Sequence, residues 1–295
     1  MNNISWRHHY IPQFYLQGFA SPNGTFKIYD VEKGYYLKNG KEFFPEAFFF
    51  EKNANTVSKD KEVSDFIEEA FKSMDNKVAE LFNRINSSDS SAANKFKIND
   101  SDIAMLQYFV GMMYWRIPNN YDEIKDIINK KRLRELGLII RKKDDNSIVE
   151  DSPIETQLKK DVNLFKFMKL WFPMVSYPEI FDCTTPLHLI PLPPGLPAVC
   201  GDNPIICTNP NTFRVYSDDY IFPLNSTKLF IRGNEVIDFM SSVKVEIDLL
   251  IFKQAKKYVS CTDEKYLEML DNMYERSYRN MDDLRHSIFS QIIGL

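Results

Sequence analysis

The chain has 295 residues, and its 44% hydrophobic and 26% charged residues are ordinary values for a globular protein with a sizeable core. The formal net charge of −4 excludes a global basic surface, so a nucleotide or nucleic-acid partner would need a local basic site. No run approaches the roughly 18 apolar residues of a membrane span, which excludes membrane insertion by a helix.

The opening segment, residues 7–19, reads RHHYIPQFYLQGF and is expected to lead from a loop into a short turn or helix. Three aromatic side chains in so short a segment can remove much apolar surface from water, which would hold down a chain end that otherwise frays. We therefore predict that Phe14, Tyr15 and Phe19 insert into the core.

A predicted hairpin and two predicted helices follow. Residues 25–30 and 35–39 have strand composition on either side of a turn, with residues 46–50 as a candidate third strand. Apolar residues at steps of three and four predict an amphipathic helix over Val63–Asn86. The next predicted helix, Ile103–Arg116, is apolar on nearly every face and ends ahead of a proline, so we expect it to be among the most buried elements.

The residue composition changes in the second half of the chain. Residues 142–153 are a predicted mobile loop or linker, and a helix is expected over about 154–170. Proline and β-branched residues between about 184 and 233 predict short strands, and the helical pattern returns after Val243. The expected fold class is α+β, mainly helical with a small, mostly antiparallel sheet, in a single domain over residues 1–295.

The four cysteines (Cys183, Cys200, Cys207 and Cys261) form no CxxC pair and lie among apolar neighbours. The first ten residues contain no apolar signal region. These two observations predict reduced, buried thiols and a cytoplasmic protein.

Four motifs resemble a bacterial family, the domain of unknown function 4238 family. They are HHYIPQFYLQGF near the start, YWRIP at 114–118, CGDNPII at 200–206 and IFPLNSTKLF at 221–230. The resemblance spans most of the chain and implies an architecture and candidate residues, but no reaction. It departs from the family pattern where Cys200 and Gly201 precede the aspartate, and the family's acid pair maps loosely onto Glu68 and Asp75.

His9, Gln13 and Arg116 are candidate site residues from the first two motifs. The His9 imidazole could act as a general base or metal ligand, because histidine titrates near neutral pH, or it could be a half-buried structural side chain. His8 is expected to face solvent. Arg116 could bind a phosphate or carboxylate, or could pair with a buried acid such as Asp202.

Asp202, Asn203, Glu68 and Asp75 complete the candidate set. Asp202 and Asn203 follow a predicted strand, where a carboxylate can serve as ligand or base, although Asx-Pro turns also use such a side chain to cap their own backbone. Glu68 and Asp75 lie about two helical turns apart, so both could hold a divalent cation with His9 and Asp202, or form a solvated helix rim.

Two functions from different classes remain open. The first is a metal-assisted hydrolase of a phosphate ester, nucleotide or nucleic acid, possessing His9, Gln13, Arg116, Asp202 and Asn203 as catalytic residues. The second is a non-catalytic binding or interaction module with a structural His/Asp/Arg network, for example in a bacterial defence or stress locus. The sequence contains no P-loop, GxGxxG, HExxH or GxSxG motif, which removes the usual support for kinase, dinucleotide-dependent and serine-hydrolase functions.

Overall fold

A computed structural model describes residues 6–59, 62–87, 99–149, 152–176, 186–192, 194–210, 213–233 and 241–293. The helices are α1 (Gln13–Gln17), α2 (Phe66–Ser87), α3 (Asp100–Arg116), α4 (Tyr121–Lys130), α5 (Ser152–Lys159), α6 (Val162–Ser176), α7 (Ser241–Gln254), α8 (Glu264–Ser277) and α9 (Met281–Ile293). The strands are β1 (Arg7–His9), β2 (Phe26–Asp30), β3 (Tyr35–Tyr36), β4 (Glu42–Phe43), β5 (Phe50–Lys52), β6 (Val57–Lys59), β7 (Glu62–Ser64), β8 (Leu187–Pro191), β9 (Val199–Gly201), β10 (Ile206–Cys207), β11 (Tyr220–Asn225), β12 (Lys228–Arg232) and β13 (Tyr258–Cys261).

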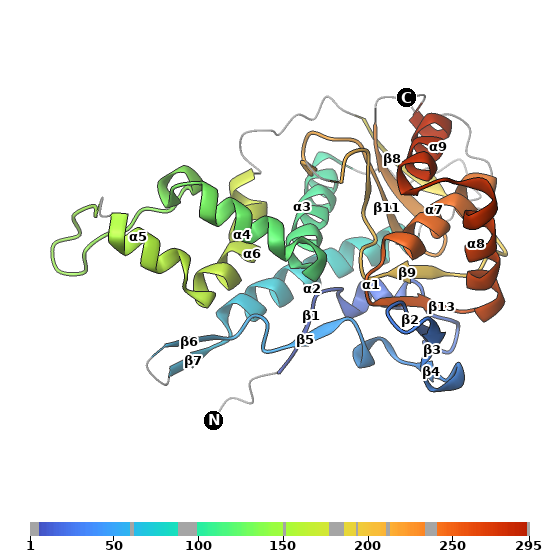
Figure 1. Ribbon diagram of the computed structural model, residues 1–295, viewed down its shortest axis with the longest axis horizontal. Coiled ribbons are helices and arrows are strands. Elements are labelled where there is room, and N and C mark those ends of the chain that lie inside the picture. Colours follow the sequence, from blue (N-terminus) through green and yellow to red (C-terminus); the bar gives the residue numbers. More distant parts are fainter. Residues whose placement is uncertain are drawn as a thin grey trace.

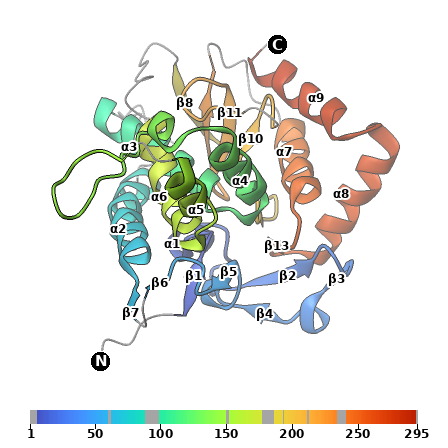
Figure 2. The same ribbon diagram turned by 60° about the vertical axis from the view of Figure 1, so that its left-hand side comes forward.

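The helices form two groups. Figure 1 shows α4, α5 and α6 at one end of the long axis and α7, α8 and α9 at the other, and Figure 2 shows the two groups on either side of the strands. One apolar cluster includes buried side chains of α4, α6, β2 and β11, with α5 packed against it, and a second includes those of α7, α8, α9, β9, β12 and β13. Each helix group therefore buries its apolar side chains in a core that it shares with strands.

The prediction of a small sheet is wrong. The described residues form a five-stranded sheet, in the order β3-β2-β13-β9 with β4 also paired to β2, and a four-stranded sheet in the order β10-β11-β12-β8. All pairs are antiparallel. The predicted hairpin at 25–39 is present as β2 and β3. Sequence patterns missed β13 of this sheet, whose four residues follow a helix closely and resemble its continuation.

Gly201 explains how a helix packs directly against the five-stranded sheet. A side chain at this position would lie 3.0 Å from the backbone oxygen of Ile251 in α7. Glycine has no Cβ atom and therefore allows this close approach, whereas a Cβ atom here would require α7 to shift by a few tenths of an ångström.

The two long predicted helices are present, but each begins at a different residue than predicted. The first two residues of the predicted Val63–Asn86 helix belong to strand β7, and α2 starts at Phe66. Helix α3 begins at Asp100, where the Asn99 side chain accepts a hydrogen bond from the Asp102 N–H (2.8 Å). Its C-terminal half is buried on every face, as predicted.

Other expectations were met in part. Residues 142–149 of the predicted mobile segment form a loop closed by a bridge between Arg141 and Ile148, residues 150–151 lie outside the described residues, and α5 begins at residue 152. Cys200, Cys207 and Cys261 are buried free thiols, as predicted, whereas Cys183 lies outside the described residues. Among the helices described, none combines the length and apolar character needed to cross a membrane.

Candidate ligand-binding pocket

The opening segment is docked into the protein, and its predicted rings are packed. Tyr15 and Phe19 are buried, and the Tyr15 ring stacks on Phe222 at 5.2 Å while its hydroxyl donates to a backbone carbonyl of β11. Phe14 is partly buried, with its ring 5.4 Å from Phe82 of α2. The residues ahead of α1 are a strand rather than the expected loop, because β1 pairs with β5, more than 40 residues further along the chain.

This pairing reverses the prediction for His8. Side chains alternate between the two faces of a strand, and β1 places His8 inward, where it is 1% exposed. The backbone N–H of Asn55 donates to His8 Nδ1 at 2.8 Å, and the Asn55 amide donates to Glu68 Oε2 at 2.7 Å. His8 therefore binds the chain that follows β5, and the expectation of a solvent-facing side chain is wrong.

His9 lies on the opposite face and is half-buried. The Gln13 amide nitrogen lies 3.3 Å from His9 Nδ1, and the two rings of His9 and Phe50 are 5.5 Å apart. The pKa of His9 is lowered from 6.5 to about 4, mainly by burial and to a smaller extent by the positive charge of Arg116, while a hydrogen bond with the Glu46 backbone opposes the shift. The imidazole is therefore neutral at physiological pH, as a base or ligand requires.

A pH-dependent stability difference should follow from this depressed pKa. The unfolded chain binds a proton at His9 as the pH falls through 6.5, whereas the folded chain does so only near 4. The free energy of unfolding should therefore fall as the pH is lowered from 6.5 to about 4, by about 2 kcal/mol for a half-buried group. We expect urea unfolding to show that His9→Asn removes this loss. The same substitution at His286, an exposed residue, is the control; parallel pH profiles for wild type and His9→Asn would contradict the prediction.

Arg116 lies at the centre of a buried network. Its Nη1 donates to Asp75 Oδ1 at 2.8 Å and its Nη2 donates to the backbone oxygen of His9 at 2.7 Å. The guanidinium also stacks over the Phe71 ring at 4.4 Å. The acid that pairs with Arg116 is thus Asp75 and not Asp202, because α2, rather than the strand that carries Asp202, packs against the end of α3.

Asp202 binds backbone amides. Its carboxylate accepts hydrogen bonds from the N–H groups of Lys256 (3.0 Å), Lys257 (2.6 Å) and Tyr258 (3.1 Å). Burial raises the pKa of Asp202, and these three donors oppose that effect. The backbone oxygen of Asn203 accepts a hydrogen bond from the Gln254 side chain. In the described chain no hydrogen bond or ion pair joins Asp202 to His9 or Arg116.

The two acids of α2 also have separate partners. Glu68 binds Asn55, and Asp75 binds Arg116, whose guanidinium opposes the rise in the pKa of Asp75 that burial causes. Within the described ranges, no three His, Cys, Asp or Glu side chains lie close enough together to hold a metal ion. The structure therefore does not bring Glu68, Asp75, His9 and Asp202 together around one divalent cation.

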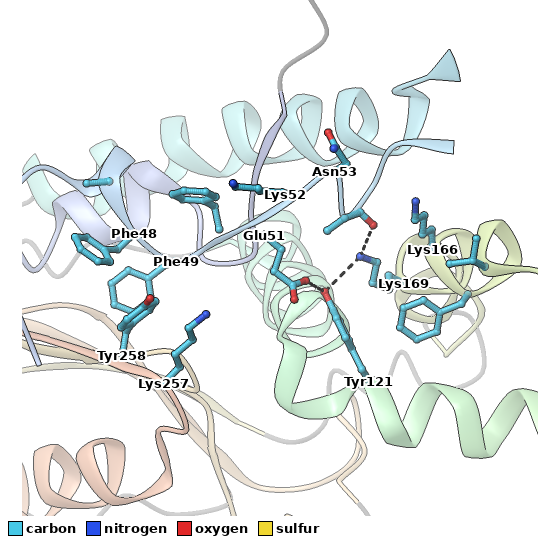
Figure 3. A pocket seen from close by; sticks show the side chains of 15 residues that line it. Phe48, Phe49, Glu51, Lys52, Asn53, Tyr121, Lys166, Lys169, Lys257 and Tyr258 are labelled. Carbon is cyan, nitrogen blue, oxygen red and sulfur yellow. Dashed lines mark hydrogen bonds between the residues drawn. The ribbon is translucent and has the colours of Figure 1, made fainter. Parts of the chain in front are cut away.

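A pocket of about 760 Å³ lies beside β5, on the side away from β1. Its walls come from four segments that are distant in the sequence, and Figure 3 shows their side chains around one space. The lining residues are Ala47, Phe48, Phe49, Phe50, Glu51, Lys52, Asn53, Ala54, Tyr121, Val162, Phe165, Lys166, Lys169, Lys257 and Tyr258. The lining thus contains four lysines and one carboxylate, that of Glu51, together with several aromatic rings.

Lys169 is the buried cation of this pocket, with 2% of its surface exposed. Its Nζ donates to the Asn55 side-chain oxygen (2.7 Å), the Ala54 carbonyl (3.1 Å) and the Tyr121 hydroxyl (3.4 Å). The Tyr121 hydroxyl in turn donates to Glu51 Oε2 at 2.7 Å, as Figure 3 shows. Burial lowers the pKa of Lys169 to about 8, so the group is still mainly charged at neutral pH.

The residues predicted from the sequence motifs support this pocket from behind. Arg116 holds the backbone of β1, which pairs with β5, and His8 holds Asn55, which binds Lys169. Asp202 holds the segment that carries Lys257 and Tyr258 into the opposite wall. The candidate residues of the sequence analysis thus position pocket walls without lining the pocket themselves.

Sequence analysis missed the lysines. Lys166 and Lys169 are three residues apart in α6, so they project from one side of an otherwise apolar helix. That spacing was an available signal, because a charged pair within an apolar helix must reach a polar site. Lys52 and Lys257 gave no such signal, since both lie in short segments among other charged residues.

These features define a protein of mixed helices and antiparallel sheets with a lysine-rich, ring-lined pocket. A family model described as "Protein of unknown function (DUF4238)" matches residues 7–264. The chain belongs to this family, which confirms the resemblance seen in the sequence. Comparisons with the curated proteins and with the solved structures found no match.

Proposed function

We propose that the protein binds a phosphate ester that carries a planar ring, such as a nucleotide, in the pocket beside β5. The observation that carries this proposal is a ring-lined pocket whose walls contain four lysines and one carboxylate, in a chain whose net charge is −4. Phosphate groups would pair with the ammonium groups, and the base would pack against the aromatic side chains.

The electrostatics of the lysines support an anionic ligand. In the described part of the chain, Lys52, Lys166, Lys169 and Lys257 form no ion pair with a carboxylate. The partners of the buried Lys169 ammonium are neutral or weakly polar groups. Glu51 is the one carboxylate among the lining residues, so the lysines leave an excess of positive charge that a bound phosphate would balance.

The pocket volume also suits this ligand class, because small-molecule sites typically span about 300–1,000 Å³. The proposal is for binding rather than hydrolysis, since the residues suggested for metal-assisted hydrolysis have separate partners. This proposal develops the alternative prediction of a binding module with a structural His/Asp/Arg network, and it adds the class of ligand.

Replacing Lys52 and Lys257 together by alanine should weaken the binding of a fluorescent ATP analogue about tenfold, as expected for two partly exposed cations beside a phosphate. Both lysines are exposed, so the double variant should fold normally. Fluorescence anisotropy at low and high salt would measure the affinity, and salt should weaken wild-type binding more than variant binding.

Lys256→Ala is the matched control, because Lys256 is an exposed neighbour that does not line the pocket. Competition by adenosine and by pyrophosphate separates the contributions of ring and phosphate. The proposal fails if wild-type protein binds no ATP analogue at millimolar concentration, or if Lys256→Ala weakens binding as much as the double variant.

A further inference from the structure

We propose that the pocket is one end of a binding track for single-stranded nucleic acid, which continues over the outer face of the β1–β5 ribbon. This inference rests on the proposed function and names its ligand more closely. Its first observation is Trp6, a large apolar side chain that is 45% exposed. The Arg7 guanidinium lies 4.8 Å from the Trp6 ring and the Lys52 ammonium lies 5.3 Å from it.

The strand register places rings and cations on the same face. Arg7 pairs with Lys52 and His9 pairs with Phe50, so these four side chains share one face of the ribbon. The Phe50 ring lies 5.9 Å from the Trp6 ring in an edge-to-face arrangement, and Arg7 also covers Phe50 at 5.2 Å. Because Phe50 and Lys52 line the pocket as well, this face is continuous with it.

The backbone of β5 adds hydrogen-bonding groups between the two parts. The Asn53 N–H donates to the Trp6 carbonyl at 2.9 Å, which fixes the alternation of bonded pairs in this antiparallel ladder. Phe50 and Lys52 therefore turn their N–H and C=O groups away from β1. Among the described strands only β1 pairs with β5, so the other edge, which borders the pocket, presents these donors and acceptors to a ligand.

Single-stranded nucleic acid matches this combination of groups. Its unpaired bases can stack on exposed rings, its phosphates can pair with lysine and arginine, and its base edges can bond to backbone groups. A duplex keeps its base faces stacked internally and offers nothing to Trp6. A mononucleotide fills the pocket but does not reach the Trp6 face. Trp6, Arg7 and Lys52 therefore determine the preference for a strand over a mononucleotide.

The test compares an eight-nucleotide single strand, as DNA and as RNA, with its duplex and with the ATP analogue. We expect the single strand to bind more tightly than the other two. Trp6→Ala should weaken single-strand binding about tenfold, the loss of one base–aromatic stack, and leave ATP-analogue binding unchanged. Trp6→Phe should retain most of the affinity. Tyr35→Ala, which removes another exposed ring remote from this face, is the control.

The outcomes separate this inference from the proposed function. If the ATP analogue binds but the single strand binds no more tightly, or Trp6→Ala leaves strand binding unchanged, the track is refuted while the pocket proposal stands. If neither binds, both fail. If an acidic peptide displaces the strand at equal ionic strength and Trp6→Ala does not affect that peptide's binding, the β5 edge is a peptide site and the inference is overturned. Unequal binding of DNA and RNA identifies the natural strand and supports the inference.

Discussion

Arg116→Met should lower the free energy of unfolding by about 2–4 kcal/mol, because it leaves a partly buried carboxylate and a backbone carbonyl without their donors. The carboxylate belongs to Asp75 and the carbonyl to His9, and methionine keeps much of the apolar contact with Phe71. Urea unfolding followed by circular dichroism would measure the change.

Arg84→Met is the matched control for this prediction. Arg84 also pairs with an aspartate, Asp102, but its side chain is 53% exposed. Exposed ion pairs contribute little to stability, so this variant should lose about 1 kcal/mol or less. Adding Asp75→Asn to Arg116→Met should recover part of the lost stability, since it removes the unpaired charge. Equal losses for the two arginine variants would show that the Arg116 network is not a structural centre.

Asp202→Ala should also destabilise the protein strongly, by about 2–4 kcal/mol. The substitution removes the acceptor of three backbone N–H groups, and hydrogen bonds to a charged group are stronger than average. Because these amides belong to the segment that carries Lys257 and Tyr258, ligand binding in the pocket should weaken in the same variant. Thermal unfolding and anisotropy would measure the two effects.

Asp202→Asn should lose less stability than Asp202→Ala, because its amide oxygen can still accept a hydrogen bond. Asp145→Ala provides the control, since Asp145 accepts hydrogen bonds from Ser147 in an exposed loop. A stable Asp202→Ala variant with unchanged ligand binding would show that the turn holds its conformation without the carboxylate.

Local sequence patterns predicted the elements whose causes are local. Ring density near the N-terminus predicted the docking of Tyr15 and Phe19, three-four periodicity predicted α2, and an apolar character on nearly every face predicted the buried α3. The β1–β5 pairing joins residues far apart in the chain, so no local pattern contains it. The wrong expectation for His8 has the same cause. Its side chain points inward because β1 pairs with β5, and local sequence patterns do not show this pairing.

For the candidate site, too, local sequence features predicted which residues matter but not which residues they contact. Residue chemistry selected Arg116, Asp75 and Asp202 as polar groups that need partners inside the protein. Which partner each one takes depends on the packing of α2 against α3 and of Asp202 against the segment ahead of β13. The sequence suggested a shared catalytic centre, whereas in the structure Arg116 and Asp75 bind each other and Asp202 binds the backbone ahead of β13.

The composition of the pocket walls has a thermodynamic consequence. The lining residues come from 47–54, Tyr121, 162–169 and 257–258, so the concave surface exists only after segments more than 200 residues apart have met. No partly folded fragment can offer the same surface, and a ligand held there binds the native state alone. By mass action, occupancy of the pocket is linked to the stability of the whole chain, and the melting temperature itself becomes a sensor for compounds that enter it.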